Sequence, residues 1–447
     1  MSSISEFYEK DRGEDYYNRL IEEIGGLNGK LNAFNAIGSI SEGFPFSVKD
    51  NICVKGIETT ASSKMLGSYV PPFNATVVER MLKKGFGFLG KTNMDEFGFG
   101  SFGLNCAKPA RNPFNEKYVA GGSSSGAAVA TSILKYHVAI AESTGGSIST
   151  PAAFCGVVGF TPTYGTISRY GLIDYANSLD KIGIMARSGD DAREVFDVVR
   201  GSDGNDATCT DPDYHDRNTG NIFVIDELTN GASEEVMREF SRLLDSLAGK
   251  GYRIERKSLK ILEKAVASYY VIVTAEASTN LAKYTGFKYG LKNDKFYQKY
   301  NDFFSDAREN FGIEAKRRIA IGTFVRGASV KDRYYVKALK VRRLIINELA
   351  GILKDGFILN PVMPIKTPSI EEAESLDPLT SYKADMFTIP PNLCGFPHVS
   401  FTYAYPDGMP IGAQLTAGHF DDYALLGFLK EWESGFKYRF RYDIGAL

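Results

Sequence analysis

The 447-residue sequence has few of the residues that build disulfide frameworks and metal sites. Histidine occurs four times and cysteine five times, with no CxxC pair. An odd number of cysteines at wide spacing predicts neither a set of disulfides nor a thiolate zinc site, and it favours a reducing compartment. The five cysteines are Cys53, Cys106, Cys155, Cys209 and Cys394.

Long hydrophobic runs and a dominant charge are also missing. No run approaches the roughly 18 apolar residues of a membrane span. The charged segment 1–17 has no apolar core of a secretory signal. The formal net charge is −2 and the pI is about 6.2, so we do not expect a broad basic surface that grips nucleic acid. These absences predict a cytoplasmic protein with no membrane contact.

What remains is the composition of a globular protein, with 43% hydrophobic and 24% charged residues. Helical and strand patterns alternate over the first 260 residues. Such alternation predicts an α/β fold with a parallel or mixed sheet. The predicted strands cover 86–90, 137–141, 221–225 and 252–255. The predicted helices cover 3–24, 124–133, 190–199 and 233–249, and one more helix is capped by Asn74 and ends at Gly85.

The segment from about 260 to 355 differs, because it is helical, rich in Lys, Arg, Tyr and Phe, and poor in turn signals. Strand patterns then return, so we expect one interwoven domain over 1–447. Its core would hold the glycine-rich loops within about 40–205, and the helical section would be inserted before the last strands. The late elements are strands at 357–359, 398–405 and 411–416, a hairpin turn at 406–408 and a helix at 421–434.

Two matches to known motifs are interpreted as accidental. Residues 85–92 (GFGFLGKT) fit the phosphate-binding loop, which follows a strand and opens a helix. Here a helix precedes the match, and the Phe-rich segment itself resembles a strand. Residues 122–126 (GSSSG) fit the nucleophile elbow, but 115–120 make a poor preceding strand and no histidine is suitably placed. His137 lies in an apolar run and is expected in the core.

Two serine-rich glycine loops at 121–126 and 144–147 carry the most chemical information, together with a lysine upstream. Glycines let consecutive N–H groups converge on one point, where they can hold a carbonyl oxygen while the Ser147 hydroxyl attacks. Lys49 can be the base if burial favours its neutral amine, and Ser123 can relay the proton. Plain turns and a solvated lysine are the alternatives.

The glycine- and serine-rich run 121–151, with PFSVKDN at 45–51, resembles the amidase signature family. The resemblance implies an α/β fold with a central mixed sheet covered by helices on both faces. It implies a Ser–cis-Ser–Lys triad in which Ser147 is the nucleophile, Ser123 follows a cis peptide bond and bridges, and Lys49 is the base. The implied oxyanion hole consists of Thr144, Gly145, Gly146 and Ser147.

Segments 90–98, 152–183 and 387–397 are similar to the glutaminase subunits of aminoacyl-tRNA amidotransferases within that family. The resemblance implies a protein that hydrolyses glutamine and passes ammonia to a partner, which uses ATP to amidate Glu-tRNA(Gln) or Asp-tRNA(Asn). The implied partners are a transferase/kinase subunit, which makes most of the tRNA contact, and a small subunit, in a heterotrimer. No cofactor is implied in this chain, and ATP and Mg²⁺ are expected at the partner.

The same resemblance implies a pocket for the head group of glutamine. Asp385, in KADMFTIP, would hold the α-amino group, and Arg318, in KRRIAIG, would hold the α-carboxylate. Tyr269 would line the same pocket. A zwitterionic head group needs one anion and one cation, and arginine binds a carboxylate in a planar fork. Arg317 is a close alternative to Arg318, and surface charge is the alternative for Asp385 and Arg318.

Two positions depart from the family pattern, which has an Asp four positions before the nucleophile and an Arg two positions after it. This chain has Ser143 and Ser149 instead. The triad and the glycines are intact, so we expect activity, while the supporting contacts of the loop and its rate are open. A stand-alone amidase on small amides and a catalytically impaired scaffold subunit are the alternatives.

Overall fold

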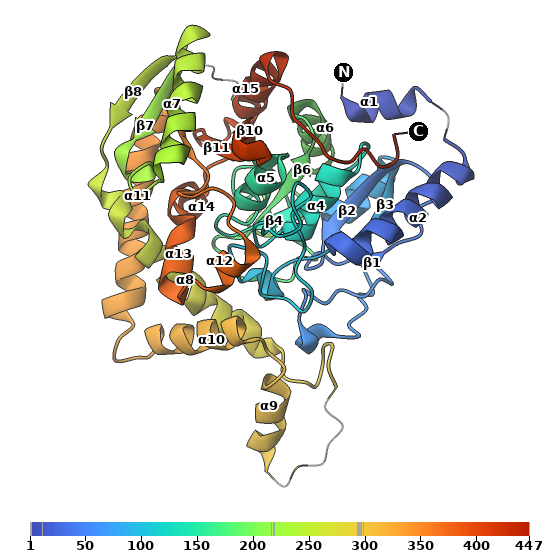
Figure 1. The fold of residues 1–447 in the computed structure, drawn as a ribbon. Helices are drawn as coiled ribbons and strands as arrows, with labels where there is room; N and C mark the ends of the chain where they lie inside the picture. Colours follow the sequence, from blue (N-terminus) through green and yellow to red (C-terminus); the bar gives the residue numbers. More distant parts are fainter. Residues whose placement is uncertain are drawn as a thin grey trace.

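One sheet runs through the molecule, and its strands come from both halves of the chain (Figure 1). The computed structural model describes residues 2–10, 12–215, 217, 220–292, 297 and 299–446. Within them the sheet has eleven strands in the order β1-β3-β2-β4-β6-β5-β10-β11-β9-β7-β8. β2 pairs in parallel with β3 and β4, and β7 with β8 and β9, while the other pairs are antiparallel. The predicted mixed sheet is therefore confirmed.

The strands are β1 (Phe34–Ile37), β2 (Phe44–Lys49), β3 (Phe86–Thr92), β4 (Val138–Ser143), β5 (Val158–Thr161), β6 (Lys181–Ala186), β7 (Asn221–Ile225), β8 (Arg253–Lys257), β9 (Phe357–Pro361), β10 (His398–Ala404) and β11 (Ile411–Thr416). The helices are α1 (Ser3–Tyr8), α2 (Glu14–Leu31), α3 (Thr76–Lys83), α4 (Ser125–Ile133), α5 (Ser149–Cys155), α6 (Gly189–Val199), α7 (Glu234–Gly249), α8 (Ala265–Asn280), α9 (Tyr300–Arg308), α10 (Ile313–Val325), α11 (Lys337–Leu353), α12 (Ile370–Glu374), α13 (Pro378–Ala384), α14 (Ile389–Cys394) and α15 (Asp422–Gly435).

Helices cover both faces of the sheet. α4 and α5 contact each other and lie on the central strands, while α6 contacts α3 and α15 on the opposite face. Every residue of α4 (SGAAVATSI) is buried, and most of its side chains are small. Small side chains let a helix approach a sheet closely. The close approach of α4 holds the serine-rich loop that precedes it directly against the strands.

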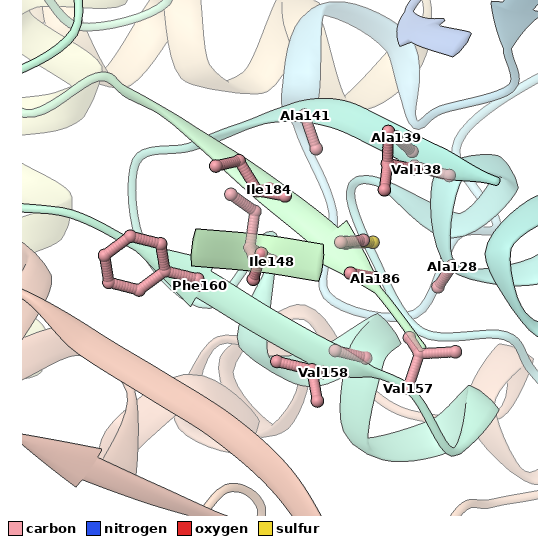
Figure 2. Close-up of a cluster of buried hydrophobic side chains, with 14 of the residues drawn as sticks. Ala128, Val138, Ala139, Ala141, Ile148, Val157, Val158, Phe160, Ile184 and Ala186 are labelled. Atoms are coloured by element: carbon pink, nitrogen blue, oxygen red, sulfur yellow. The ribbon is translucent and has the colours of Figure 1, made fainter. Parts of the chain in front are cut away.

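A cluster of buried apolar side chains includes Ile148, the residue after the second glycine loop (Figure 2). Ile148, which follows Ser147, packs where β5 and β6 carry glycines. A Cβ on Gly159 would lie 2.9 Å from Ile148 Cγ2, and one on Gly183 would lie 2.7 Å from Ile148 Cδ1. The two glycines therefore make room for Ile148, which anchors the loop to the core.

The helical section lies at one side of the sheet (Figure 1). α8 packs against α10 and α11, and α11 contacts β9. α9 extends away from the body of the molecule. Residues 293–296 and 298, which belong to the predicted helical section, lie outside the described residues. The section places α8 beside the glycine loops, and Asp385, from a short helical turn before α14, also lies there.

Several predicted elements need correction. The helix predicted over 3–24 is two helices, α1 and α2, because the chain is extended at Gly13 between them. Ala75 rather than Asn74 precedes α3, and the Asn74 side chain accepts a hydrogen bond from Lys55 N instead. β1, β2, β5 and β6 are strands that the sequence pattern does not predict. The GFGFLGKT segment forms the inner strand β3, so the interpretation that it is no phosphate loop is confirmed.

Candidate active site

The site begins where two parallel neighbouring strands end. Lys49 is the last residue of β2, and Glu142 and Ser143 end β4. β2 and β4 pair in parallel, with Val48 opposite Ile140. Parallel strands end at the same edge of a sheet, and the loops beyond such carboxyl ends are where α/β proteins place ligands. The pairing therefore brings the lysine and both glycine loops to one place.

Lys49 is fully buried, and its Nζ has three oxygen neighbours. Ser123 Oγ lies at 2.8 Å, the carbonyl oxygen of Glu142 at 3.0 Å, and Glu142 Oε2 at 2.9 Å. The predicted contact between Lys49 and Ser123 is therefore present. The carboxylate of Glu142 was not predicted, and it makes Lys49 one half of a buried ion pair.

Ser123 is fully buried at the start of the loop that precedes α4. The peptide bond between Gly122 and Ser123 is cis, as the resemblance implied. Asp95 holds this segment, because its backbone N–H donates to the Ser123 carbonyl at 3.1 Å. The Asp95 carboxyl accepts N–H bonds from Gly103 and Asn105, and burial raises its pKa to about 7.

Ser147 lies between β4 and α5, beside the Ser123 loop. The Ser124 N–H donates to the Ser147 carbonyl at 3.2 Å, which ties the two glycine loops together. Within the described residues the Ser147 hydroxyl makes no hydrogen bond, to Ser123 or to any other group, and the residue is 7% exposed whereas Ser123 is 0% exposed. The amides of Gly145, Gly146 and Ser147 likewise donate to nothing in that part of the chain. A hydroxyl group and three backbone donors are thus available to a ligand.

The carboxyl group of Glu142 and a further one, of Asp180, meet at Thr144. Its Oγ1 lies 2.7 Å from Glu142 Oε1 and 2.9 Å from Asp180 Oδ1. Asp180 Oδ2 accepts the N–H groups of Tyr175 and Ala176 at 2.8 Å. Burial, and then the charge of Glu142, raise the pKa of Asp180 well above its usual value. The set Lys49, Ser123, Glu142, Thr144 and Asp180 is called the relay wall below.

The three residues predicted to bind the glutamine head group converge on the other side of the glycine loop. A Cβ on Gly145 would lie 2.8 Å from the Tyr269 hydroxyl, and one on Gly146 would lie 3.3 Å from Asp385 Oδ1. A side chain on Gly145 would clash with Tyr269, and one on Gly146 would clash with Thr150 and Thr388. The set Tyr269, Arg318 and Asp385 is called the head-group wall below.

Arg318 is the buried member of the adjacent pair, with a side chain that is 5% exposed, against 35% for Arg317. Glu314 Oε1 accepts from its Nε at 2.8 Å, and Nη1 donates to the Tyr175 hydroxyl. Its guanidinium lies over four aromatic rings, and this geometry favours Arg318 over Arg317 as the pocket residue. The rings belong to Phe99, Tyr175, Tyr270 and Tyr382.

Asp385 is buried, with one oxygen satisfied and one open. Ser101 Oγ donates to Oδ2 at 2.5 Å, whereas Oδ1 has no hydrogen-bond partner among the described residues. Burial raises the pKa of Asp385 to about 6. A pocket of about 300 Å³, lined in part by Ser101, Arg318 and Tyr382, opens beside this wall. The open acceptor is placed to receive a cationic group.

The two serines that depart from the family pattern both hold the nucleophile loop. Ser143 Oγ donates to the Gly145 carbonyl at 2.9 Å, and Ser149 Oγ donates to Gln414 Oε1 at 2.9 Å. Both are buried. The loop therefore keeps a hydrogen-bonded support at each end, formed by neutral groups instead of charged ones.

His137 is buried in the core, bonded to Ser47 and Thr131, and burial lowers its pKa to about 3. Its predicted structural role is confirmed. In the described part of the chain no group of three or more His, Cys, Asp or Glu residues is arranged to hold a metal ion. A search of the same residues found no helix whose length and hydropathy suit a membrane span.

The carboxyl groups of Asp95, Glu142 and Asp180 are the site residues that the sequence analysis missed. Glu142 had a usable signal, because a charged residue at the end of the apolar strand VAIAES would be buried without a partner. The obvious partner was the lysine at the end of the neighbouring strand FPFSVK. Asp95 and Asp180 lie in loops and gave no such signal.

The site can now be compared with known proteins. The family model described as Amidase matches residues 29–426. The chain is 40% identical over 434 residues to the A-subunit of glutamyl-tRNA(Gln) amidotransferase from Sulfolobus acidocaldarius, covering 94% of this chain and 89% of that protein. It is 41% identical over 397 residues to the A-subunit of the same enzyme from Halobacterium salinarum, covering 86% of this chain and 93% of that one.

Solved structures agree with these relatives. The crystal structure of the A-subunit of glutamyl-tRNA(Gln) amidotransferase from Thermotoga maritima is similar, with a TM-score of 0.80 and 34% identity over 94% of this chain and 91% of that one. A solved amidase is similar with a TM-score of 0.77 and 26% identity, covering 94% and 96%.

Proposed function

The chain belongs to the amidase family, and from that premise we propose that it is the glutamine-hydrolysing subunit of an aminoacyl-tRNA amidotransferase. The Ser147 hydroxyl attacks the side-chain amide carbon of glutamine, and Ser123 accepts the proton of that hydroxyl. Lys49 contacts Ser123 through a hydrogen bond. The amides of residues 144–147 hold the oxyanion. Ammonia leaves, and water then releases glutamate from the Ser147 ester. The whole chain, 1–447, acts as one domain, with the helical section of about 260–355 inserted into it.

The observation that carries this proposal is the open carboxylate oxygen of Asp385. A buried acceptor without a partner is costly unless a ligand completes it. Asp385 Oδ1 faces Gly146, one residue from Ser147, and Arg318 supplies a cation on the same wall. An α-amino acid carries one ammonium and one carboxylate, so it fits the head-group wall, whereas a simple amide would leave Asp385 unpaired.

The partners belong to the same proposal. The relatives are named as subunits of an amidotransferase, so we propose that a transferase/kinase subunit and a further small subunit complete a heterotrimer. ATP, Mg²⁺ and most tRNA contacts are assigned to the transferase, since the net charge of −2 gives this chain no basic excess. The choice between Glu-tRNA and Asp-tRNA belongs to that partner. A cytoplasmic location suits the five free cysteines.

A direct test measures amide hydrolysis by the purified heterotrimer and by the chain alone. We expect release of ammonia from glutamine, and little from a small aliphatic amide that lacks the head group. Labelling with a glutamine-like electrophile should modify Ser147. Rapid turnover of the small amide without preference for glutamine would favour a stand-alone amidase. No adduct and no ammonia would favour a scaffold with an inactive site.

A further inference from the structure

The relay wall holds an unexpected carboxylate in contact with the expected base. Glu142 Oε2 accepts from Lys49 Nζ at 2.9 Å and from Asn51 Nδ2 at 3.2 Å, and all three residues are buried. A neutral amine beside an ionised Glu142 would leave a buried negative charge without compensation, which is costly. The ion pair and a pair of neutral groups both leave no net charge, and the hydrogen bonds that Glu142 accepts from Asn51 and Thr144 favour the ionised carboxylate. Lys49 therefore rests as an ammonium, in place of the neutral amine expected from the sequence.

The contacts of Lys49 suit this state. An ammonium has three donors, and Nζ has three acceptors in Ser123 Oγ, the Glu142 carbonyl and Glu142 Oε2. In this arrangement Nζ has no lone pair to accept the Ser123 proton. A base that can take up a proton has to be found elsewhere in the wall.

Counting protons at Thr144 shows which carboxyl group carries the negative charge. Its hydroxyl has one hydrogen but contacts both Glu142 Oε1 and Asp180 Oδ1, so one carboxyl group must itself donate. Asp180 is that group, because Glu142 already accepts from Lys49 whereas Asp180 has no ion pair among the described residues. Burial and the charge of Glu142 also raise the pKa of Asp180 well above the usual value. Asp180 thus donates to Thr144, Thr144 donates to Glu142, and Glu142 stays anionic.

We propose that Glu142 is the terminal proton acceptor of the relay, and that Lys49 is an ammonium both before and after the transfer. This inference rests on the proposed function only in taking Ser147 as the nucleophile. Three bonds to hydrogen break and three form in one sequence. Lys49 gives a proton to Glu142 Oε2, Ser123 gives its proton to Lys49 Nζ, and Ser147 gives its proton to Ser123 Oγ as its oxygen attacks the carbonyl carbon.

The charges balance at each end of this transfer. Before it, the Lys49 ammonium is paired with the Glu142 carboxylate. After it, Glu142 is neutral, and the same ammonium is the counter-charge for the oxyanion held by the glycine loop. The proton then returns from Glu142 through Lys49 and Ser123 to the departing nitrogen, the C–N bond breaks, and ammonia leaves. The ion pair is restored while the acyl group remains on Ser147.

The proposal is tested by replacing Glu142, the proton acceptor, with a side chain of the same shape. Glu142→Gln retains an oxygen for Lys49 and Asn51 but cannot take up a proton. We expect glutamine hydrolysis, and labelling of Ser147 by a fluorophosphonate, to slow by about 100-fold or more, the range of general-base catalysis. Glu142→Asp should recover part of both rates. If a neutral Lys49 were the base, loss of the carboxylate would leave the rates unchanged or raise them, and that result overturns the proposal.

The matched control is Asp191→Asn, which removes a buried carboxylate from the start of α6. Asp191 is bonded to Ser3 and Ile4 and lies outside both walls. Its rates should equal those of the wild type. A second measurement does not depend on the activity of any variant. It is the ¹⁵N chemical shift of Lys49 Nζ in the wild-type chain, and the signal is assigned because it is absent from the spectrum of Lys49→Arg. An ammonium shift at the pH of rapid labelling is expected, and an amine shift overturns the proposal.

These measurements separate this inference from the proposed function. If the wild-type chain is labelled at Ser147 but does not hydrolyse glutamine, the proposal that glutamine is the substrate is contradicted. Slower labelling of Ser147 in Glu142→Gln than in the wild type would then still support the relay. A wild-type chain that hydrolyses glutamine, with a Glu142→Gln variant labelled equally fast, contradicts the relay alone. A wild-type chain that is not labelled at Ser147 contradicts both.

Discussion

The relay wall and the head-group wall handle buried charge in opposite ways. In the relay wall Lys49 is paired with Glu142, and Thr144 links Glu142 to Asp180, so its charges are compensated inside the protein. In the head-group wall Asp385 keeps one oxygen without a partner among the described residues, although the residue is buried. One wall is complete without a ligand, and the other is completed by one.

This difference separates two kinds of function. A compensated cluster keeps its geometry whichever amide is bound, so it should control the chemical step for every substrate. A buried acceptor without a hydrogen-bond partner is completed only by a ligand that donates to it, so it should control which substrate binds. Changes to the relay wall should therefore lower kcat for all amides, whereas changes to the head-group wall should raise KM for glutamine.

The largest effect is expected when the relay wall loses its cation. Lys49→Met keeps an unbranched side chain but removes the amine, so Ser123 has no partner for its proton. Hydrolysis of glutamine should fall by roughly 10⁴-fold or more, the scale at which members of a catalytic triad act. Any residual turnover of a small amide should fall by the same factor. The measurement is steady-state release of ammonia from each substrate.

The heterotrimer provides the control for this variant. In the proposed heterotrimer with Lys49→Met, added ammonium salts should still support amidation of the mischarged tRNA, because the proposal assigns the transferase reaction to the partner. Full glutamine-dependent activity of Lys49→Met would contradict the assignment of Lys49 to the relay. Loss of the ammonium-dependent reaction would instead indicate a damaged complex.

Adjacent arginines test the head-group wall. Arg318→Ala removes the buried guanidinium, and KM for glutamine should rise by about 100-fold, as expected when one partner of a buried charged contact is lost. Arg317→Ala is the matched control and should change KM by less than about threefold, since its side chain is partly exposed. Neither change should slow labelling of Ser147 by a fluorophosphonate. A larger effect for Arg317 would reverse the assignment.

Asp385 gives a pH-dependent form of the same test. Its carboxyl, with a pKa raised by burial to about 6, must be ionised to bind an ammonium. The value of kcat/KM for glutamine should be constant above pH 6 and should fall about tenfold per pH unit below it. In Asp385→Asn this fall of kcat/KM below pH 6 should be absent, and glutamine should bind poorly at every pH. The rate of Ser147 labelling by a neutral electrophile should not show this fall below pH 6, either in the wild type or in Asp385→Asn.

The stability of the Asp385→Asn variant follows from the same shift. A carboxyl that is harder to ionise when folded destabilises the native state as pH rises through its folded pKa of about 6. At pH 7 the variant should therefore melt roughly 2–4 °C above the wild type. Below pH 4 both side chains are neutral, and the difference should vanish. An equal or lower Tm at pH 7 would show that the charge of Asp385 is compensated within the protein.

The two walls also differ in how far the sequence predicts them. The glycine- and serine-rich loops and the SVKDN segment upstream singled out Lys49, Ser123 and Ser147 as candidates from local pattern. The strand FPFSVK and its parallel pairing with VAIAES were not predicted. Tyr269 and Asp385 lie in helical segments far along the chain, where one polar residue looks like many others. Only family resemblance selected them, because their contact with Gly145 and Gly146 arises from tertiary packing.

Within the fold, length alone does not decide which elements the pattern predicts, because six-residue β2 and β6 are missed whereas five-residue β7 is predicted. β7 and α15 are close to the predicted ranges, since each has a clear period and turn residues at its ends. β5 has four residues, too few for a period to be seen. Helix α2 begins after Gly13, and the apolar pattern on both sides of that break predicts a single helix.

The smallest effect should appear where the nucleophile loop meets the core. Ile148→Val removes one methyl group from the side chain that packs over Gly159 and Gly183, at a cost of about 0.5–1.5 kcal/mol in unfolding free energy. Since Ile148 is adjacent to Ser147, kcat should fall a few-fold for glutamine and for a small amide alike, with KM unchanged. Ile184→Val, an equal change in neighbouring β6, is the control: it should cost similar stability and leave kcat intact. Equal losses of kcat in both variants would mean that general softening of the core, rather than the anchoring of Ser147, slows the reaction.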